Sequence, residues 1–420
     1  MTWTRPRFRL LCSVTTLCGF VIAIWPTAAR ADDDHRQGGH EFTVRCDKGK
    51  TIGAALGEHD GAVTLKVVGV CDEHVVINRN DVRLVAGAPG AGINGPDRNT
   101  NTLQVTGDRF VLDGLAVTGG RNAIVISGGG RAMLSNCTAR GTGTGIISGV
   151  GIIFFQGANG TVDTCEASGN SADGLMLDAA IATIVNSRFV GNGRAGILVF
   201  NGSTARIGMT NAFAAAGNTI TGNGSAGIHV TLNSLAVVVA NTISGNGTNP
   251  AGPFGRSGIT VFMSRADLPG GNLITTNFGQ GILIGGASTV AIGDPGFGLP
   301  TRNTIRGNAV APPPPGAAPL PGIGAALNSA VILRDALVEA NAGAGVTLGV
   351  RSTMTVVSSM ITGNGAEGIQ LSQGSATVFQ PNLPLSNVSG NTGIDLNCLD
   401  GESSVTGPIT PGATSNCTGF

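Results

Sequence analysis

A cluster of charged side chains between residues 163 and 194 is the part of this sequence best suited to chemistry. It comprises Asp163, Glu166, Asp173, Asp178, Arg188 and Arg194, whereas only 12% of the chain is charged. Carboxylates on neighbouring strands can supply the oxygen ligands that Ca²⁺ prefers, and an adjacent arginine can act as a base or clamp a substrate. We therefore assign Asp163 and Glu166 as metal ligands and Asp173, Asp178 and Arg194 as catalytic groups. No cofactor is required by the sequence, and calcium is the one candidate.

Two further residues are assigned to substrate binding. Arg188 lies one repeat unit beyond Glu166, and His229 takes the outward position of a Gly-Ile-x-Val stretch, between Leu198 and Thr260 of neighbouring units. The alternative interpretation is structural, with the charged residues forming exposed ion pairs between strands and His229 an ordinary surface residue. No Ser, His and Asp set can be placed together, and no lysine lies in the repeats, which disfavours a lysine base.

These side chains must be positioned by a repeated unit of 22 to 23 residues. A glycine followed by Ile, Leu or Val opens each unit, at Gly151, Gly174, Gly196, Gly227, Gly258, Gly281, Gly322, Gly345 and Gly368. The spacings are 23, 22, 31, 31, 23, 41, 23 and 23, so some units carry insertions. Each unit holds three short stretches of alternating apolar residues, which indicates strands, and 22 residues are too few for a strand, a packed helix and two turns.

A column of asparagines runs in the same register. It consists of Asn170, Asn192, Asn223, Asn246, Asn277, Asn308, Asn341 and Asn364. A buried amide in every turn can donate and accept hydrogen bonds along the stack and so satisfy backbone groups that the turn leaves unpaired. We therefore predict a structural asparagine ladder.

Six cysteines lie beyond the first 31 residues, at Cys46, Cys71, Cys137, Cys165, Cys398 and Cys417. An even number in an exported chain indicates disulfides, and no two are two to four residues apart as zinc ligands commonly are. Cys137 and Cys165 hold equivalent places in consecutive units, where strands about 4.8 Å apart allow a bond. Cys398 and Cys417 are expected to close the C-terminal segment, and the remaining two bracket a helix predicted at residues 51–58.

The N-terminus has the pattern of a secretory signal peptide. Arg5, Arg7 and Arg9 precede an apolar run that ends before Ala29-Arg30-Ala31. We expect residues 1–31 to be removed, which leaves no membrane span and directs the protein to the periplasm or the extracellular medium. The alternative, a membrane anchor, is disfavoured because the apolar run is short. Residues 32–45 are polar and are expected to form a mobile leader.

The rest of the chain is expected to form a solenoid with a cap at each end. Residues 46–100 are expected to form an N-terminal cap and the first coils, residues 101–395 the β-helix, and residues 396–420 a C-terminal cap closed by a disulfide. Insertions interrupt the repeats at residues 209–217, 249–256, 294–302 and 309–321. Such loops collect on the surface of a solenoid and often line its binding face.

Composition excludes some partners. The 25 basic and 25 acidic residues leave no net charge to attract nucleic acid. The chain has no Tyr, and both of its Trp residues, Trp3 and Trp25, lie in the predicted signal peptide. Few polar-tipped aromatics therefore remain for stacking against sugars.

The repeat resembles that of secreted bacterial proteins of the pectate-lyase-like superfamily, which are right-handed parallel β-helices. The resemblance rests on Asn-x-Ile-x-Gly-Asn-Gly followed by Gly-Ile-x-Val, as at residues 218–230, and on the phrase at residues 292–305. It covers about residues 100–395. The superfamily includes lyases, hydrolases, epimerases and proteins without known catalysis, so the resemblance implies the fold more narrowly than the function.

We therefore predict an all-β protein, a right-handed parallel β-helix solenoid of about eleven coils with an N-terminal helical cap. The favoured function is binding or processing of an extracellular polysaccharide, and an enzyme of this kind would resemble a polysaccharide lyase or a glycoside hydrolase. The alternative is a noncatalytic structural or adhesive scaffold of the envelope or matrix, favoured by the sparse charges and near-uniform repeats. The oligomeric state is left open.

Overall fold

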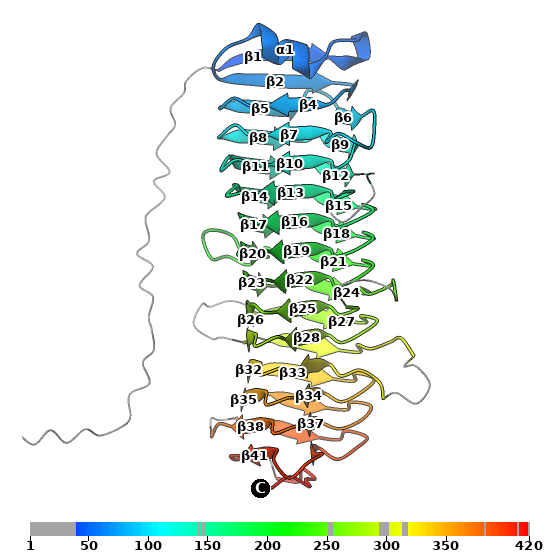
Figure 1. Ribbon diagram of the computed structural model, residues 1–420, viewed down its shortest axis with the longest axis vertical. Helices are drawn as coiled ribbons and strands as arrows, with labels where there is room; N and C mark the ends of the chain where they lie inside the picture. The colour runs from blue at the N-terminus through cyan, green and yellow to red at the C-terminus, as the bar shows by residue number, and fades with distance from the viewer. Residues whose placement is uncertain are drawn as a thin grey trace, which may run out of the picture. The chain divides into compact units, whose positions relative to one another are not determined.

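The computed structural model describes residues 39–141, 143, 148–250, 255–293, 302–312, 318–381, 384–409 and 411–418. The predicted signal peptide and residues 32–38 of the predicted leader lie outside the described residues. In the described part, three parallel sheets, A, B and C, wind around one core, because from β2 onward each strand pairs with the strand three further along the chain (Figure 1). No helix among the described residues has the length and apolar character needed to cross a membrane.

Sheet A has 15 strands. They are β1 (His40–Arg45), β2 (Val63–Val68), β5 (Val82–Ala86), β8 (Phe110–Asp113), β11 (Arg131–Ser135), β14 (Asn159–Asp163), β17 (Ile181–Val185), β20 (Thr204–Ile207), β23 (Leu235–Val239), β26 (Arg265–Gly270), β29 (Thr289–Ile292), β32 (Ala330–Arg334), β35 (Thr353–Val357), β38 (Ala376–Phe379) and β41 (Ser404–Thr406).

Sheet B has 13 strands. They are β3 (Val70–Asp72), β6 (Gly92–Gly95), β9 (Ala116–Gly119), β12 (Thr138–Gly141), β15 (Glu166–Ser168), β18 (Arg188–Val190), β21 (Thr219–Thr221), β24 (Thr242–Ser244), β27 (Leu273–Thr275), β30 (Asn303–Arg306), β33 (Ala336–Glu339), β36 (Met360–Thr362) and β39 (Asn387–Ser389).

Sheet C also has 13 strands. They are β4 (Val75–Ile77), β7 (Leu103–Val105), β10 (Ile124–Ile126), β13 (Ile152–Phe155), β16 (Leu175–Asp178), β19 (Ile197–Phe200), β22 (Ile228–Thr231), β25 (Ile259–Phe262), β28 (Ile282–Gly285), β31 (Ile323–Ala325), β34 (Val346–Leu348), β37 (Ile369–Leu371) and β40 (Leu396–Cys398).

The stack is longer than the eleven coils predicted. Residues 46–100, predicted as the N-terminal cap and first coils, contribute the strands β2 to β6, and the predicted C-terminal cap contributes β40 and β41. Residues 40–45 form β1, which pairs with β2 along its whole length. The prediction of a mobile leader at residues 32–45 is therefore wrong for residues 40–45. The strands β1, β40 and β41 thus lie in segments that were not predicted to belong to the coils.

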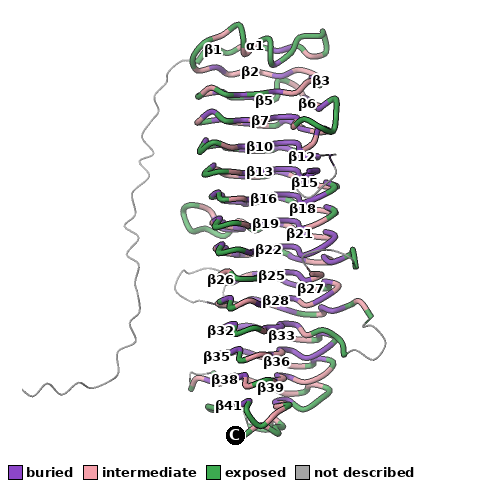
Figure 2. Tube along the Cα trace, viewed as in Figure 1, coloured by how far each residue is buried: buried purple, intermediate pink, exposed green. Residues whose placement is uncertain are grey.

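The core consists of inward-facing aliphatic residues stacked in columns. Ile152, Leu175, Ile197, Ile228 and Ile259 occupy one register position on successive strands of sheet C, and all are fully buried. Burial of each such side chain contributes about 1.5–3 kcal/mol. The buried trace follows the strands, whereas exposed residues gather in the turns (Figure 2).

The predicted asparagine ladder is present. Each amide in the column donates to the next, as from Asn223 Nδ2 to Asn246 Oδ1 at 2.8 Å, and the column runs on to Asn391. A second ladder, which was not predicted, joins Asn218, Asn241, Asn272 and Asn303 at the corner between sheets A and B. Both ladders bind backbone groups inside the turns and therefore hold the coils in register.

The predicted N-terminal helix covers one end of the stack as α1 (Ile52–Glu58), which follows the short 3₁₀ turn η1 (Cys46–Lys48). Glu73 accepts hydrogen bonds from the amides of Ile52 and Gly53, where the helix dipole favours a carboxylate. Arg79 donates to the carbonyls of Leu56, His59 and Gly61 at the other end. The helix is thus fixed at both ends.

The three predicted disulfides are present. Cys46 bonds to Cys71 beside α1, Cys137 to Cys165 between consecutive coils, and Cys398 to Cys417 at the C-terminal end. The final segment adds bridges from Ser415 to Leu396 and from Thr418 to Ser404, which extend the last rungs of sheets C and A. The C-terminal segment therefore covers the end of the core.

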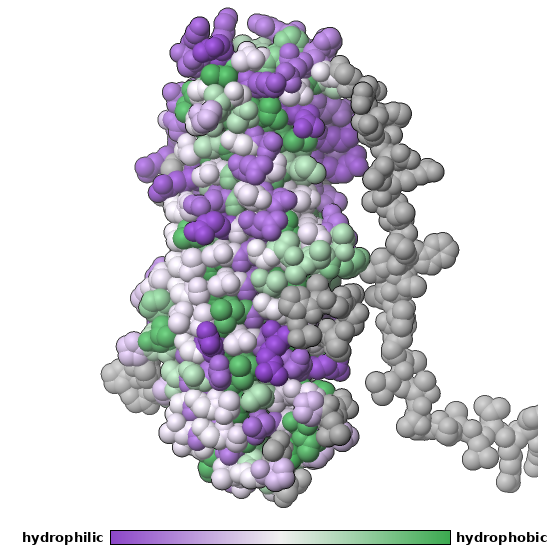
Figure 3. Space-filling model, turned by 180° about the vertical axis from the view of Figure 1, so that it is seen from behind, coloured by the Kyte–Doolittle hydropathy of each residue, from purple (hydrophilic) through white to green (hydrophobic). Residues whose placement is uncertain are grey.

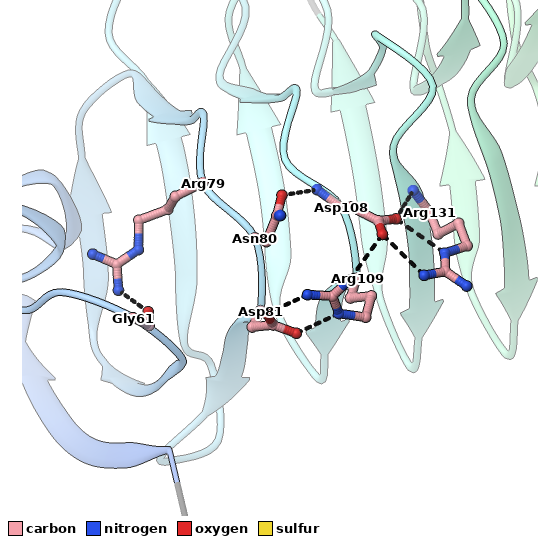
Figure 4. A network of polar contacts seen from close by, with 7 residues as sticks. All are labelled: Gly61, Arg79, Asn80, Asp81, Asp108, Arg109 and Arg131. Atoms are coloured by element: carbon pink, nitrogen blue, oxygen red, sulfur yellow. Dashed lines mark hydrogen bonds and ion pairs between the residues drawn. The ribbon is translucent and has the colours of Figure 1, made fainter. Parts of the chain in front are cut away.

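A surface network of ion pairs joins the turns between sheets C and A in the first coils (Figure 4). Arg109 contacts both Asp81, at 2.5 Å, and Asp108, at 3.1 Å, and Arg131 also contacts Asp108, at 2.9 Å. The hydrogen bonds from Arg131 hold the pKa of Asp108 well below its usual range. Because these side chains are exposed to solvent, each pair contributes little to stability. Hydrophilic side chains gather over these coils (Figure 3).

Candidate functional site

The predicted charged cluster separates into three groups on different faces of the β-helix. Asp173, Arg194 and His229 come together at the start of the sheet C strands. Asp178 lies at the far end of β16, and Asp163, Glu166 and Arg188 lie at the corner between sheets A and B. The sequence register placed the residues of the predicted cluster on neighbouring coils, but it could not show which of them lie on the same face of the β-helix.

The first group is a buried polar cluster. Asp173 is fully buried, its Oδ1 accepts a hydrogen bond from the amide of Ala195 at 2.9 Å, and its Oδ2 lies 3.2 Å from Arg194 Nη2. An ion pair between neighbouring coils therefore joins Asp173 and Arg194. His229 is 5% exposed, so the interpretation of this histidine as a surface residue is wrong.

Burial shifts both titrating groups toward their neutral forms. Desolvation raises the pKa of Asp173 to about 6, against the attraction of Arg194, which lowers it. Desolvation and the positive charge of Arg194 lower the pKa of His229 to about 4. Shifts of this size occur both at functional sites and in buried structural pairs, so accessibility must decide between them.

The outward residues around this cluster are themselves buried. Val125, Ile153, Met176 and Leu198 precede His229 in one register column of sheet C, and none is more than 8% exposed. They form a second apolar cluster with Val150, Ala172 and Ala195 of the preceding turns. This apolar column is thus buried, and within the cluster Asp173 and His229 are closed to a polymer while the Arg194 side chain is 15% exposed.

Asp178 is separated from this cluster. It ends β16, and its Oδ1 accepts a hydrogen bond from Asn201 Nδ2 at 2.9 Å on the next coil. Because a strand rises about 3.3 Å per residue, Asp178 and Asp173 are more than about 10 Å apart along the chain. The two carboxylates therefore do not form one catalytic pair.

Glu166 and Arg188 of the third group line a groove of about 350 Å³ at the corner between sheets A and B, beside the Cys137–Cys165 disulfide. We call it the corner groove, and its polar residues are Asn136, Thr138, Thr164, Glu166, Asn186 and Arg188. Arg188 lies 3.3 Å from Glu166, and both side chains are about half exposed. This pair is worth little for stability but leaves polar atoms open to a ligand.

The predicted calcium ligands have other partners. Asp163 Oδ1 accepts from Asn186 Nδ2 at 2.9 Å and from Thr164 Oγ1 at 3.0 Å, and Glu166 accepts from Ser168 and Arg188. Within the described ranges no three His, Cys, Asp or Glu side chains are grouped so that they could hold a metal. Two carboxylates that are already hydrogen-bonded are a poor fit to the six to eight oxygens that Ca²⁺ takes.

A second groove, which the sequence did not reveal, crosses the outer face of sheet A. We call this groove of about 290 Å³ the sheet A groove, and its polar residues are Asn159, Thr161, Thr183, Thr204, Arg206 and Asn211. The first five lie at outward positions of β14, β17 and β20. Asn211 comes from the inserted loop 209–217, which leaves the stack after β20 (Figure 1).

The two grooves lie side by side on the same coils. Thr161 of the sheet A groove is three residues from Thr164 of the corner groove, and Thr183 is three residues from Asn186. At about 3.3 Å per residue, the grooves are about 10 Å apart. Together they present hydroxyls, amides and one guanidinium each over the coils of β14 and β17, a lining suited to hydrogen bonding with sugar hydroxyls.

The architecture defines the class of protein as a parallel β-helix. The family model for a right-handed β-helix region matches residues 71–243 and 210–388, and the chain belongs to this family. The fold predicted from the repeat is thereby confirmed. A search of curated proteins finds no match.

Several solved structures are similar to the chain at low sequence identity. The periplasmic alginate epimerase AlgG is 14% identical over 81% of this chain and 77% of its own, with a TM-score of 0.47. The A-module of the Azotobacter vinelandii mannuronan C-5 epimerase AlgE6 is 16% identical over 81% and 92%, with a TM-score of 0.49. The Dettilon tailspike protein is 13% identical over 85% and 64%, with a TM-score of 0.42. At these identities they say nothing of the activity of this chain.

Proposed function

We propose that this protein is exported and binds an extracellular polysaccharide across the coils of β14, β17 and β20. The observation that supports this proposal is the pair of adjacent grooves, in which hydroxyl, amide and guanidinium groups are arrayed at a spacing set by the strands. A sugar chain presents many hydroxyls in a row, and several modest hydrogen bonds to such an array add up to useful affinity.

Export is supported by the disulfides and by the signal-like N-terminus. Three disulfides join the cap, two consecutive coils and the C-terminal segment. Such bonds form and persist in oxidising compartments, whereas cytosolic thiols are kept reduced. The site of action is therefore proposed to be the periplasm or the extracellular medium.

We propose binding without cleavage. Asp173 and His229 are buried, Asp178 lies apart from them, and Glu166 is paired with Arg188. Lyase or hydrolase chemistry needs a base or acid within hydrogen-bond reach of the sugar. The buried Asp173 has no such access, and Asp178, which is partly exposed, lies apart from the cluster of Asp173, Arg194 and His229. The noncatalytic scaffold remains the competing role, and it requires no saccharide ligand.

The test is a binding measurement with matched threonine variants. Neutral and acidic polysaccharides are titrated into the mature protein, and binding is measured by calorimetry. The same mixtures are assayed for unsaturated sugars and new reducing ends, which cleavage would produce. Thr161→Val with Thr204→Val removes two hydroxyls of the sheet A groove. The matched control, Thr353→Val with Thr355→Val, changes the same two register columns of sheet A on distant coils.

At about 1 kcal/mol for each neutral hydrogen bond, the groove variant is expected to bind about thirtyfold more weakly, while the control binds as the parent does. No cleavage products are expected. Absence of binding to every polysaccharide, or equal binding by both variants, would overturn the proposal. Thermal unfolding of both variants checks that each is folded.

A further inference from the structure

The inserted loop 209–217 is a small hairpin that is fixed at its base and reaches over sheet A with its tip. Met209 pairs antiparallel with Ala215, and the amide of Ala216 donates to the carbonyl of Gly208 at 2.8 Å. Met209 is buried against Val239, which anchors the base. The tip residues 211–215, by contrast, are exposed, and Asn211 and Phe213 contact side chains of sheet A.

Two donors of sheet A converge on one oxygen of this tip. Thr183 Oγ1 lies 3.1 Å from Asn211 Oδ1 and donates to it, and Arg206 Nη1 donates to the same oxygen at 3.2 Å. The Arg206 guanidinium also lies over the ring of Phe213, 5.4 Å from its centre. A neutral amide oxygen thus occupies a position where a hydroxyl and a cation meet.

The positive charge of Arg206 is not neutralised by a carboxylate. Among the described residues, Arg206 contacts the Asn211 amide and the Phe213 ring and forms no ion pair. The acid in its register column is Asp267, two strands away, and that residue is paired with Arg265 at 3.0 Å. The corner groove differs, because Arg188 is paired there with Glu166. The sheet A groove therefore carries a net positive charge.

We propose that Asn211 is a placeholder for a negatively charged oxygen of an acidic sugar. When such a ligand enters, its anionic oxygen takes the hydrogen bonds of Thr183 and Arg206, and the tip of the hairpin moves away. Hydrogen bonds to a charged acceptor are about twice as strong as those to a neutral one, so the exchange favours the ligand. This inference rests on the proposed function and adds to it a charge preference and a moving element.

Two substitutions of Asn211 are expected to change the affinity for an acidic chain in opposite directions, which a purely structural loop would not show. Asn211→Asp supplies an internal carboxylate that competes with the ligand, so it is expected to weaken binding of an acidic chain by at least tenfold. Asn211→Ala removes the competitor and is expected to leave binding equal or tighter. Asn328→Asp, an exposed position on a distant turn, controls for the added charge.

The ligands for this test are a hexameric oligouronate and its methyl ester, which share a backbone and differ in charge. Parent protein is expected to prefer the charged chain, and Arg206→Gln is expected to bind the two chains equally. If both chains bind equally and Asn211→Asp behaves as the parent does, the placeholder inference is wrong although polysaccharide binding stands. If neither chain binds, the proposed function also fails.

Movement of the tip is measured separately with Phe213→Trp. The only tryptophans of the chain are Trp3 and Trp25, in the predicted signal peptide, so the mature variant has a single indole. Its ring can keep the contact with Arg206, and loss of that contact changes its emission. A change is expected with the oligouronate and with sodium glucuronate but not with the methyl ester or glucose. If neither the oligouronate nor sodium glucuronate changes the emission, the inference is wrong, whatever the binding measurements with the two chains show.

Discussion

Replacing Asp173 by asparagine removes one of two buried titrating groups whose effects on stability oppose each other. The pKa of Asp173 is raised from 3.8 to about 6, so between these pH values the folded protein binds more protons than the unfolded chain and stability falls as pH rises. The pKa of His229 is lowered from 6.5 to about 4, so in that window stability rises with pH.

The magnitudes nearly cancel in the parent protein. Each pKa unit corresponds to 1.36 kcal/mol, and shifts of about two units give about 3 kcal/mol for each group. The parent is therefore expected to show little net pH dependence from this cluster between pH 4 and 6. In each single variant, the pH dependence of the free energy of unfolding is set by the titrating group that remains.

The assay is urea unfolding of the mature protein at steps between pH 4 and 7, with free energies of unfolding compared between variants. Relative to the parent, Asp173→Asn is expected to become about 3 kcal/mol more stable as pH rises from 4 to above 6. His229→Gln is expected to lose about 3 kcal/mol relative to the parent over the same interval, and the double variant to follow the parent. Two single variants with the same slope as the parent would refute the argument that desolvation governs this cluster.

Three further predictions concern the ladder and the two caps. Asn223→Ala leaves a buried amide and a carbonyl without their partner and is expected to cost about 2–5 kcal/mol in urea unfolding, whereas Asn99→Ala, at an exposed loop position, is expected to cost less than about 0.5 kcal/mol. Arg79→Ala removes the donor to three carbonyls around the end of α1, so hydrogen exchange is expected to rise there and nowhere else. Removing the Cys398–Cys417 disulfide, which spans 19 residues, is expected to cost about 3 kcal/mol and to speed exchange in residues 411–418, and unchanged exchange would contradict its role as a clamp.

Much of the fold follows from residues that repeat. The Asn170 column and the Gly-Ile pairs recur in unit after unit, and their spacing alone predicts stacked strands and a ladder. The second ladder escaped prediction because its column changes identity, with Ser187 before Asn218 and Ala336 after Asn303. Coils that depart from the consensus, including those before residue 100, can be counted only in three dimensions.

The candidate site was predictable only in part. Register placed Asp173 beside Arg194, because neighbouring coils fix which residues meet. It could not show that His229 is buried, since alternation says only that the side chain points away from the core. The sheet A groove was missed for a related reason, because Thr161 and Thr183 are ordinary outward residues until Asn211 folds over them from the inserted hairpin.

Mapping the bound saccharide by hydrogen exchange tests the central claim most directly. Mature protein is exchanged with and without the polysaccharide that binds it most tightly. We predict protection in β14, β17 and β20 and in the hairpin 209–217, with the strands of sheet C unchanged. Protection confined to sheet C around Asp173 and His229, or no protection anywhere on sheet A, would contradict the account.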